Sequence, residues 1–94
     1  MSYHYPFDTT WGKQEIIDVV NFFTLVEQAY ESQVERDILL AAYQKFKQVV
    51  PSKGEEKSYF ADFQKASGYS SYHAVKKARE ANSKTFRMNQ GNPR

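Results

Sequence analysis

The 94-residue sequence predicts an all-α fold: a single small domain with four main helices in a bundle or an irregular array. Apolar residues recur at helical spacing in four segments, and no segment shows the alternation that is typical of β-strands. Helix-capping or helix-ending residues separate the four segments. A chain of this length forms one hydrophobic core, and 40% hydrophobic with 16% aromatic residues is the composition of a globular protein.

The first predicted helix begins near Gly12 and runs to about Glu31. Gly12 is a tolerable N-cap, and Glu15 follows at the third helical position. The main apolar stripe consists of Ile16, Val19, Phe22, Phe23, Val26 and Tyr30. Because other apolar residues lie outside this stripe, we expect the helix to contact two neighbouring elements, or one element and a second copy of the protein.

The second predicted helix covers about Arg36 to Val49 and stops before Pro51, because a proline forces the preceding residue out of the α region. Its stripe consists of Ile38, Leu39, Ala42, Tyr43, Phe46 and Val49. The third helix follows Ser52, which has capping-box spacing to Glu55, and Gly68 is well placed to end it. Its stripe consists of Tyr59, Phe60, Phe63 and Ala66.

The fourth predicted helix is capped by Ser70 or Ser71 and reaches about Asn82. Its inward-facing residues are Tyr72, Ala74, Val75 and Ala78. The chain beyond it has no periodicity and is rich in Asn, Gly and Pro, so we expect a mobile C-terminal tail over residues 83–94. The helical domain then comprises residues 1–82.

The composition and the apolar segments predict a cytoplasmic protein without a membrane partner. Cysteine is absent, which excludes disulfides, thiolate metal sites and a cysteine nucleophile and suits a reducing cytosol. The first residues show no basic region followed by an apolar run, so we expect no signal peptide. The most apolar window, residues 16–26, contains Asp18 and Asn21 and is far shorter than the roughly 20 apolar residues of a membrane span.

Charge is distributed unevenly along the chain, although the formal net charge is only +2. Residues 1–40 contain two cationic and seven acidic side chains, whereas residues 41–94 contain eleven cationic and four acidic side chains. This division predicts either that one end binds an anion or that the two ends attract each other in the fold.

Motifs of the common enzyme classes are absent from the sequence. There is no nucleophile elbow, no P-loop, no dinucleotide-binding glycine motif and no H-E-x-x-H zinc motif. His4 and His73 lie far apart in the sequence, and neither has a second metal ligand at helical spacing. We therefore expect no enzyme activity, no metal site and no cofactor.

The start of the third helix contains a first candidate site. Glu56 lies on the apolar arc of this helix, and a carboxylate on an apolar face needs a partner or stays protonated. One interpretation is a partly buried ion pair that locks the turn before the helix; the other is a site where the first N–H groups bind an anion. We favour the ion pair and expect Glu56 to bond a lysine or a tyrosine, whereas an exposed, unpaired Glu56 would favour the anion site. The candidate residues are Lys47, Ser52, Lys53, Glu56 and Lys57.

The basic face of the fourth helix is a second candidate site. A basic helix face with aromatic residues nearby is typical of surfaces that bind RNA or DNA. The alternative, which we favour, is a solvated face balanced by the acidic first helix. The residues of this surface are His73, Lys76, Lys77 and Arg79, and the tail adds Lys84, Arg87 and Arg94.

Four groups of residues are distinctive when they are taken together. They are Tyr3, Tyr5-Pro6, Asp8 and Trp11; Val19-Val20-Asn21-Phe22-Phe23; Phe46-Lys47 with Val50-Pro51-Ser52-Lys53 and Glu55-Glu56-Lys57; and Gly68-Tyr69-Ser70 with Tyr72. Over about residues 3–82 this order resembles the YktA-like uncharacterised family of small Firmicutes proteins, uncharacterised protein family 0223. The resemblance implies a compact all-helical cytoplasmic protein and supplies no activity. Gly54 and the Gly12-Lys13 helix start depart from the family pattern.

The leading functional prediction is a small non-enzymatic interaction protein that binds a protein partner or a second copy of itself. It depends on apolar residues that lie outside the main helix stripes and would be exposed for binding. These residues are Ile17, Val20, Leu25 and Leu40. The alternative is nucleic-acid or phosphate-ligand binding through the basic second half of the chain, and an enzyme ranks third.

Overall fold

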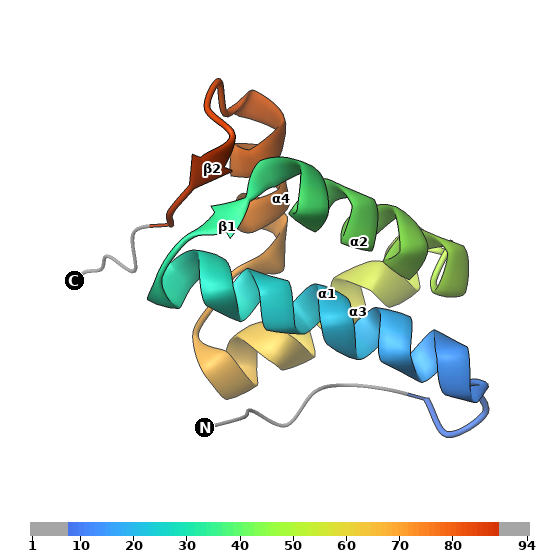
Figure 1. Ribbon diagram of the computed structural model, residues 1–94. Helices are drawn as coiled ribbons and strands as arrows, with labels where there is room; N and C mark the ends of the chain where they lie inside the picture. Colours follow the sequence, from blue (N-terminus) through green and yellow to red (C-terminus); the bar gives the residue numbers. More distant parts are fainter. Residues whose placement is uncertain (1–7, 89–94) are drawn as a thin grey trace.

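The computed structural model describes residues 8–88. Within this range the elements are α1 (Lys13–Glu31), β1 (Val34–Glu35), α2 (Arg36–Val49), α3 (Lys53–Ser67), α4 (Ser71–Glu80) and β2 (Thr85–Phe86). α2 runs back alongside α1, and α3 and α4 complete the helical fold around this pair (Figure 1). The predicted all-α class with four main helices is confirmed. Within residues 8–88, each helix is too short or too polar to span a lipid bilayer.

The predicted capping residues explain the limits of α3 and α4. Ser52 Oγ accepts a hydrogen bond from the Glu55 N–H at 3.3 Å before α3. Ser70 Oγ accepts one from the His73 N–H at 3.2 Å before α4. Gly68 ends α3 with a φ of 84°, a left-handed conformation that glycine adopts without strain. Residues next to each boundary thus determine where the two helices start and where α3 stops.

The core is aromatic and centres on α1. Phe22 and Phe23 are fully buried, and rings from α2 and α3 surround them. The centroid of the Phe22 ring lies 5.0 Å from that of Phe46 and 5.9 Å from that of Phe60. The Phe23 and Phe63 centroids are 4.6 Å apart. Such ring pairs add to the stabilisation that comes from the burial of apolar area alone.

α1 contacts more than one neighbour, as its apolar residues outside the main stripe indicate. The helix begins after Gly12, whose N–H donates to Glu15 Oε1 at 2.8 Å. It packs along α2, contacts α4, and reaches α3 through the phenylalanine rings. Leu25, which lies outside the main stripe, packs against the core. Neighbouring elements of the same chain therefore account for these apolar contacts of α1.

Three residues that the stripes predict to face inward are exposed. Ile38 is 49% exposed, Tyr72 is 61% exposed, and Ala66 is also exposed. The buried residues of α4 are Ser71, Ala74, Val75 and Ala78. Because these side chains are small, α4 packs closely and leaves the Tyr72 ring outside the contact. In α2 the buried stripe starts at Leu39, so the neighbouring Ile38 lies at its edge and faces solvent.

The segment after α4 differs from the predicted tail. β1 and β2 form a two-stranded antiparallel sheet in which Val34 pairs with Phe86. Phe86 is buried, and the Met88 N–H donates to an α1 carbonyl at 2.8 Å. The prediction that regular structure ends before Ser83 is therefore wrong for the residues of β2. Residues 89–94 of the predicted tail lie outside the described residues.

α2, α3 and α4 form the sides of a triangle. α3 and α4 diverge from the turn at Gly68 (Figure 1), and α2 spans their other ends. Near the end of α2, Lys47 bonds Glu56 in the first turn of α3. At the start of α2, Arg36 Nε donates to the Ala78 carbonyl of α4 at 2.9 Å. These contacts fix the geometry of the candidate site, which lies between the three helices.

Candidate functional site

A groove with a volume of about 830 Å³ lies between α2, α3 and α4. Each helix contributes one face, because its lining residues recur three or four positions apart. The charged lining residues are Lys47, Lys53, Glu56, Lys57, Lys76 and Arg79. Five cationic side chains thus surround a single carboxylate, which makes the groove strongly positive.

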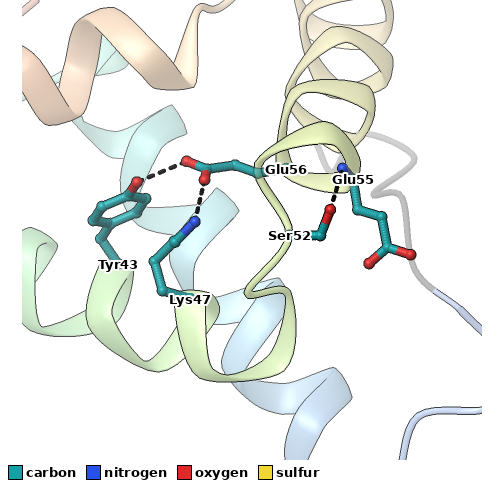
Figure 2. A network of polar contacts seen from close by, with 5 residues as sticks. All are labelled: Tyr43, Lys47, Ser52, Glu55 and Glu56. Atoms are coloured by element: carbon teal, nitrogen blue, oxygen red, sulfur yellow. Dashed lines mark hydrogen bonds and ion pairs between the residues drawn. The ribbon is translucent and has the colours of Figure 1, made fainter.

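Glu56 is the centre of a polar network between α2 and α3 (Figure 2). Its Oε2 accepts a hydrogen bond from the Tyr43 hydroxyl at 2.7 Å, and its Oε1 accepts one from Lys47 Nζ at 2.5 Å. The side chains of Glu56 and Lys47 are 12% and 26% exposed. Glu55 points away from the network (Figure 2). The predicted pairing of Glu56 is confirmed, with both a lysine and a tyrosine as partners.

The spacing on α2 explains why one carboxylate receives two donors. Tyr43 and Lys47 are four residues apart, so both side chains leave the same face of the helix. A partly buried ion pair is stabilising only when hydrogen bonds replace the water that its charges lose. The Tyr43 hydroxyl supplies such a bond to Glu56. The network therefore ties α2 to α3 across the turn at Pro51.

The other residues of the predicted anion site have different surroundings. The Glu55 N–H donates to Ser52 Oγ, and the Glu56 N–H donates to the Ser52 carbonyl at 2.9 Å. Both N–H groups are therefore satisfied within the chain, which leaves fewer donors for an anion at the start of α3. Lys53 and Lys57 are exposed and form no ion pair within residues 8–88; they line the groove instead.

Tyr43 connects the Glu56 network to α4. The guanidinium carbon of Arg79 lies 5.5 Å from the centroid of the Tyr43 ring, in a cation–π arrangement. Burial raises the pKa of Tyr43 to about 12, with further contributions from the hydrogen bond to Glu56 and the charge of that carboxylate. The Arg79 guanidinium offsets part of this increase.

The raised pKa of Tyr43 predicts how stability changes in alkaline solution. In the unfolded chain a tyrosine ionises near pH 10, whereas folded Tyr43 keeps its proton until about pH 12. Between these values unfolding releases a proton, so the free energy of unfolding falls as the pH rises. We expect this fall to be shallower in Tyr43→Phe than in the wild type when urea denaturation is measured from pH 9 upward. Parallel curves for the two proteins would contradict the assignment.

The predicted basic surface of α4 is divided between two sides of the helix. Lys76 and Arg79 line the groove, whereas His73 and Lys77 are exposed outside it. His73 Nδ1 lies 2.7 Å from the side-chain oxygen, Oγ, of Ser70, the residue that caps α4. Two of the four predicted basic residues thus line the groove, together with lysines from α2 and α3.

Within residues 8–88, no ion pair connects the acidic first part of the chain to the basic second part. Two ion pairs lie wholly within residues 8–88. They join Arg36 with Asp37 in the first part, and Lys47 with Glu56 in the second part. Most of the cations of the groove are therefore not neutralised by α1.

The apolar residues predicted to form an interaction surface are mostly not exposed. Leu25 and Leu40 are half-buried and pack against the core, and Val20 is also half-buried. Ile17 is 48% exposed. The prediction that these residues are exposed is therefore wrong for Val20, Leu25 and Leu40, because a helix that contacts several elements buries residues on more than one side.

The sequence does not reveal that the two candidate sites share one groove. Tyr43 and Phe60 belong to predicted core stripes, yet both also line the groove. One signal could have indicated the contact between α2 and α3. The Tyr43 hydroxyl and the Lys47 amine occur one turn apart near a short connection, where both can reach a carboxylate on the next helix.

Comparison with known proteins gives the family of the chain. Residues 2–87, which include every residue of the groove, match the family described as Uncharacterised protein family (UPF0223). A UPF0223 protein of Oceanobacillus iheyensis is 66% identical over 88 residues, which cover 94% of this chain and 100% of the relative. A UPF0223 protein of Bacillus pumilus is 51% identical over 86 residues, covering 92% and 97%. One of Lysinibacillus sphaericus is 51% identical over 81 residues, covering 86% and 85%. The resemblance found in the sequence is thereby confirmed, and the chain belongs to the UPF0223 family.

Proposed function

We propose that this protein is a small non-enzymatic interaction module of the cytoplasm, and that it binds a protein partner in the groove between α2, α3 and α4. The groove itself supports this function, because cations from three helices and apolar side chains line one hollow. Protein interfaces combine an apolar centre with polar and charged groups at the rim. The lack of cysteine supports the cytoplasmic location.

Some cations of the groove are held by contacts within the chain, and others are not. Lys47 is held by Glu56, and Arg79 lies over the Tyr43 ring. Lys53 and Lys57 are exposed and have no carboxylate partner within the described residues. A partner could therefore contact these lysines without breaking an internal ion pair. Because the network between α2 and α3 is already ordered, binding would cost little additional conformational entropy there.

Charge reversal of Lys53 and Lys57 is expected to weaken partner binding by about 10-fold or more. The variant carries Lys53→Glu and Lys57→Glu, both near the start of α3. Acidic residues are favourable at a helix start, which offsets part of the repulsion between the new carboxylates and Glu55 and Glu56, so we expect the variant to fold. Proteins and RNA captured from a lysate of the native cell by each immobilised protein would be quantified side by side.

A matched control variant carries Lys13→Glu and Lys45→Glu. It has the same change in charge, and Lys13 is the first residue of α1 as Lys53 is of α3. Neither control residue lines the groove. We expect the control to retain the captured proteins. If both double variants lose the same proteins, or neither does, the groove is not the binding site.

Self-association through the groove is one form of this proposal. The opposite charges of the two parts of the chain favour contact between copies. Light scattering at high protein concentration tests it directly. A clean monomer removes self-association and leaves a different protein as the partner.

Nucleic-acid or phosphate-ligand binding through the same cations is the second candidate function. Tyr72 is 61% exposed in the groove next to Lys76, and an exposed ring beside a cation suits stacking of a base. Single-stranded RNA should then bind at low salt, and the affinity should fall steeply as salt rises. Absence of binding at low salt removes this candidate, and titration with phosphate and nucleotides tests the smaller ligands.

A further inference from the structure

The groove changes in character from one end to the other. α3 ends and α4 begins at the Gly68 turn, and the groove residues next to this turn are uncharged: Gln64, Ser70 and Tyr72. The opposite side lies along α2, where α3 begins and Arg79 covers the Tyr43 ring. The cations on that side are Lys47, Lys53, Lys57 and Arg79.

Apolar side chains lie between the cationic side and the Gly68 end, and one further cation, Lys76, lies beside them on α4. Phe60 and Ala61 lie midway along α3, and Val75 lies midway along α4. Phe60 is only half-buried, so part of its ring faces the groove. An occupant that follows the groove from α2 therefore meets four cations, then an apolar surface with Lys76 beside it, and finally the exposed Tyr72 ring.

Glu56 limits which anions suit the cationic side. Glu56 lines the groove, and its carboxylate already accepts a hydrogen bond from Lys47. A nucleic-acid backbone carries evenly spaced phosphates, so a long contact would bring one of them near this carboxylate, and like charges at close range are unfavourable. A peptide can place its carboxylates beside Lys53, Lys57 or Arg79 and leave the position next to Glu56 uncharged. The charge pattern therefore favours a peptide over a polyanion.

We propose that the partner enters the groove as an acidic peptide segment with an apolar anchor. Its carboxylates contact Lys53, Lys57 and Arg79. A neighbouring aromatic or aliphatic side chain packs against Phe60 and Tyr72. This assignment rests on the function proposed above and specifies the chemistry of the partner.

Selection from a displayed library of random peptides on the full chain tests the assignment. We expect the enriched peptides to combine acidic residues with a nearby aromatic or aliphatic residue. Fluorescence anisotropy then measures individual peptides against the variants. The Lys53→Glu, Lys57→Glu variant should bind them about 10-fold more weakly or worse, and the Lys13→Glu, Lys45→Glu control should bind them as the wild type does.

The apolar anchor is tested with a second matched pair of variants. Tyr72→Ser removes an exposed ring from the groove, and Ile38→Ser removes an exposed side chain outside it. Because both residues are exposed, both variants are expected to fold. We expect Tyr72→Ser to weaken peptide binding by about 3- to 10-fold and Ile38→Ser to have no effect.

The possible results distinguish a failure of the acidic-peptide assignment from a failure of the proposed protein-binding function. Enriched peptides that lack acidic residues but depend on the groove variants would overturn the acidic assignment and leave the interaction function intact. Peptides that bind equally well to all variants, or a selection without enrichment, would overturn the groove as a protein-binding site. Single-stranded RNA that binds, and that the Lys53→Glu, Lys57→Glu variant no longer binds, would assign the groove to nucleic acid instead.

Discussion

The Phe22→Ala variant is expected to lose about 3–5 kcal/mol of unfolding free energy, because truncation of a buried ring removes apolar contacts and leaves a cavity. Phe22 has no exposed surface. Its ring contacts Tyr43, Phe46 and Phe60, so the cavity would open where α1, α2 and α3 meet. Small domains have a total stability of about 5–15 kcal/mol. The loss is therefore a large share of the total stability, and at the lower end of this range the variant would be only marginally folded at room temperature.

Urea denaturation followed by circular dichroism measures this loss. Ile17→Ala is the control, because Ile17 lies on the same helix and is 48% exposed. We expect the control to change stability by no more than about 0.5 kcal/mol. If Phe22→Ala does not fold, Phe22→Leu keeps most of the volume and should still cost about 1–2 kcal/mol. Equal effects for Phe22→Leu and Ile17→Ala would show that Phe22 is not a central core residue.

The limits of the helices could be predicted because residues next to each boundary determine them. Ser52 and Ser70 accept N–H bonds at helix starts, Gly68 adopts the left-handed conformation, and Pro51 prevents α2 from continuing. Each of these effects needs only a few neighbouring residues. The pairing of Glu56 could be predicted for a similar reason, since its partners lie only one helix earlier.

Features that depend on distant contacts could not be predicted. Helical spacing places Tyr72 and Ile38 beside buried residues, but only the position of the neighbouring helix decides which edge of a stripe is covered. β1 and β2 contain two residues each, too few for a periodic pattern, and their pairing joins Val34 to Phe86 across most of the chain.

The groove is also a consequence of tertiary structure. The angle between α3 and α4 and the position of α2 across their ends decide that Lys76 and Arg79 face the lysines of α3. No local pattern distinguishes these two cations from His73 and Lys77 on the same short helix. The sequence therefore predicts the individual basic residues, whereas the fold decides which of them act together.

The Glu56→Ala variant is expected to lose about 1–3 kcal/mol of unfolding free energy, because it leaves Lys47 and the Tyr43 hydroxyl without their partner in a partly buried place. The Glu56 side chain is 12% exposed, so water replaces the lost bonds only incompletely. Glu56→Gln keeps the shape and one acceptor oxygen but removes the charge, and should lose roughly half as much.

Glu55→Ala separates the network from the general effects of losing an acid near a helix start. Glu55 precedes Glu56 in the first turn of α3, and its side chain is exposed and points away from the network (Figure 2). Both alanine variants change helix propensity and the interaction with the helix dipole alike, so their difference reports the bonds to Tyr43 and Lys47. We expect urea denaturation to give a clearly larger loss for Glu56→Ala. Equal losses would mean that the network contributes no more than an exposed ion pair, and that α2 and α3 are held together by the phenylalanine rings alone.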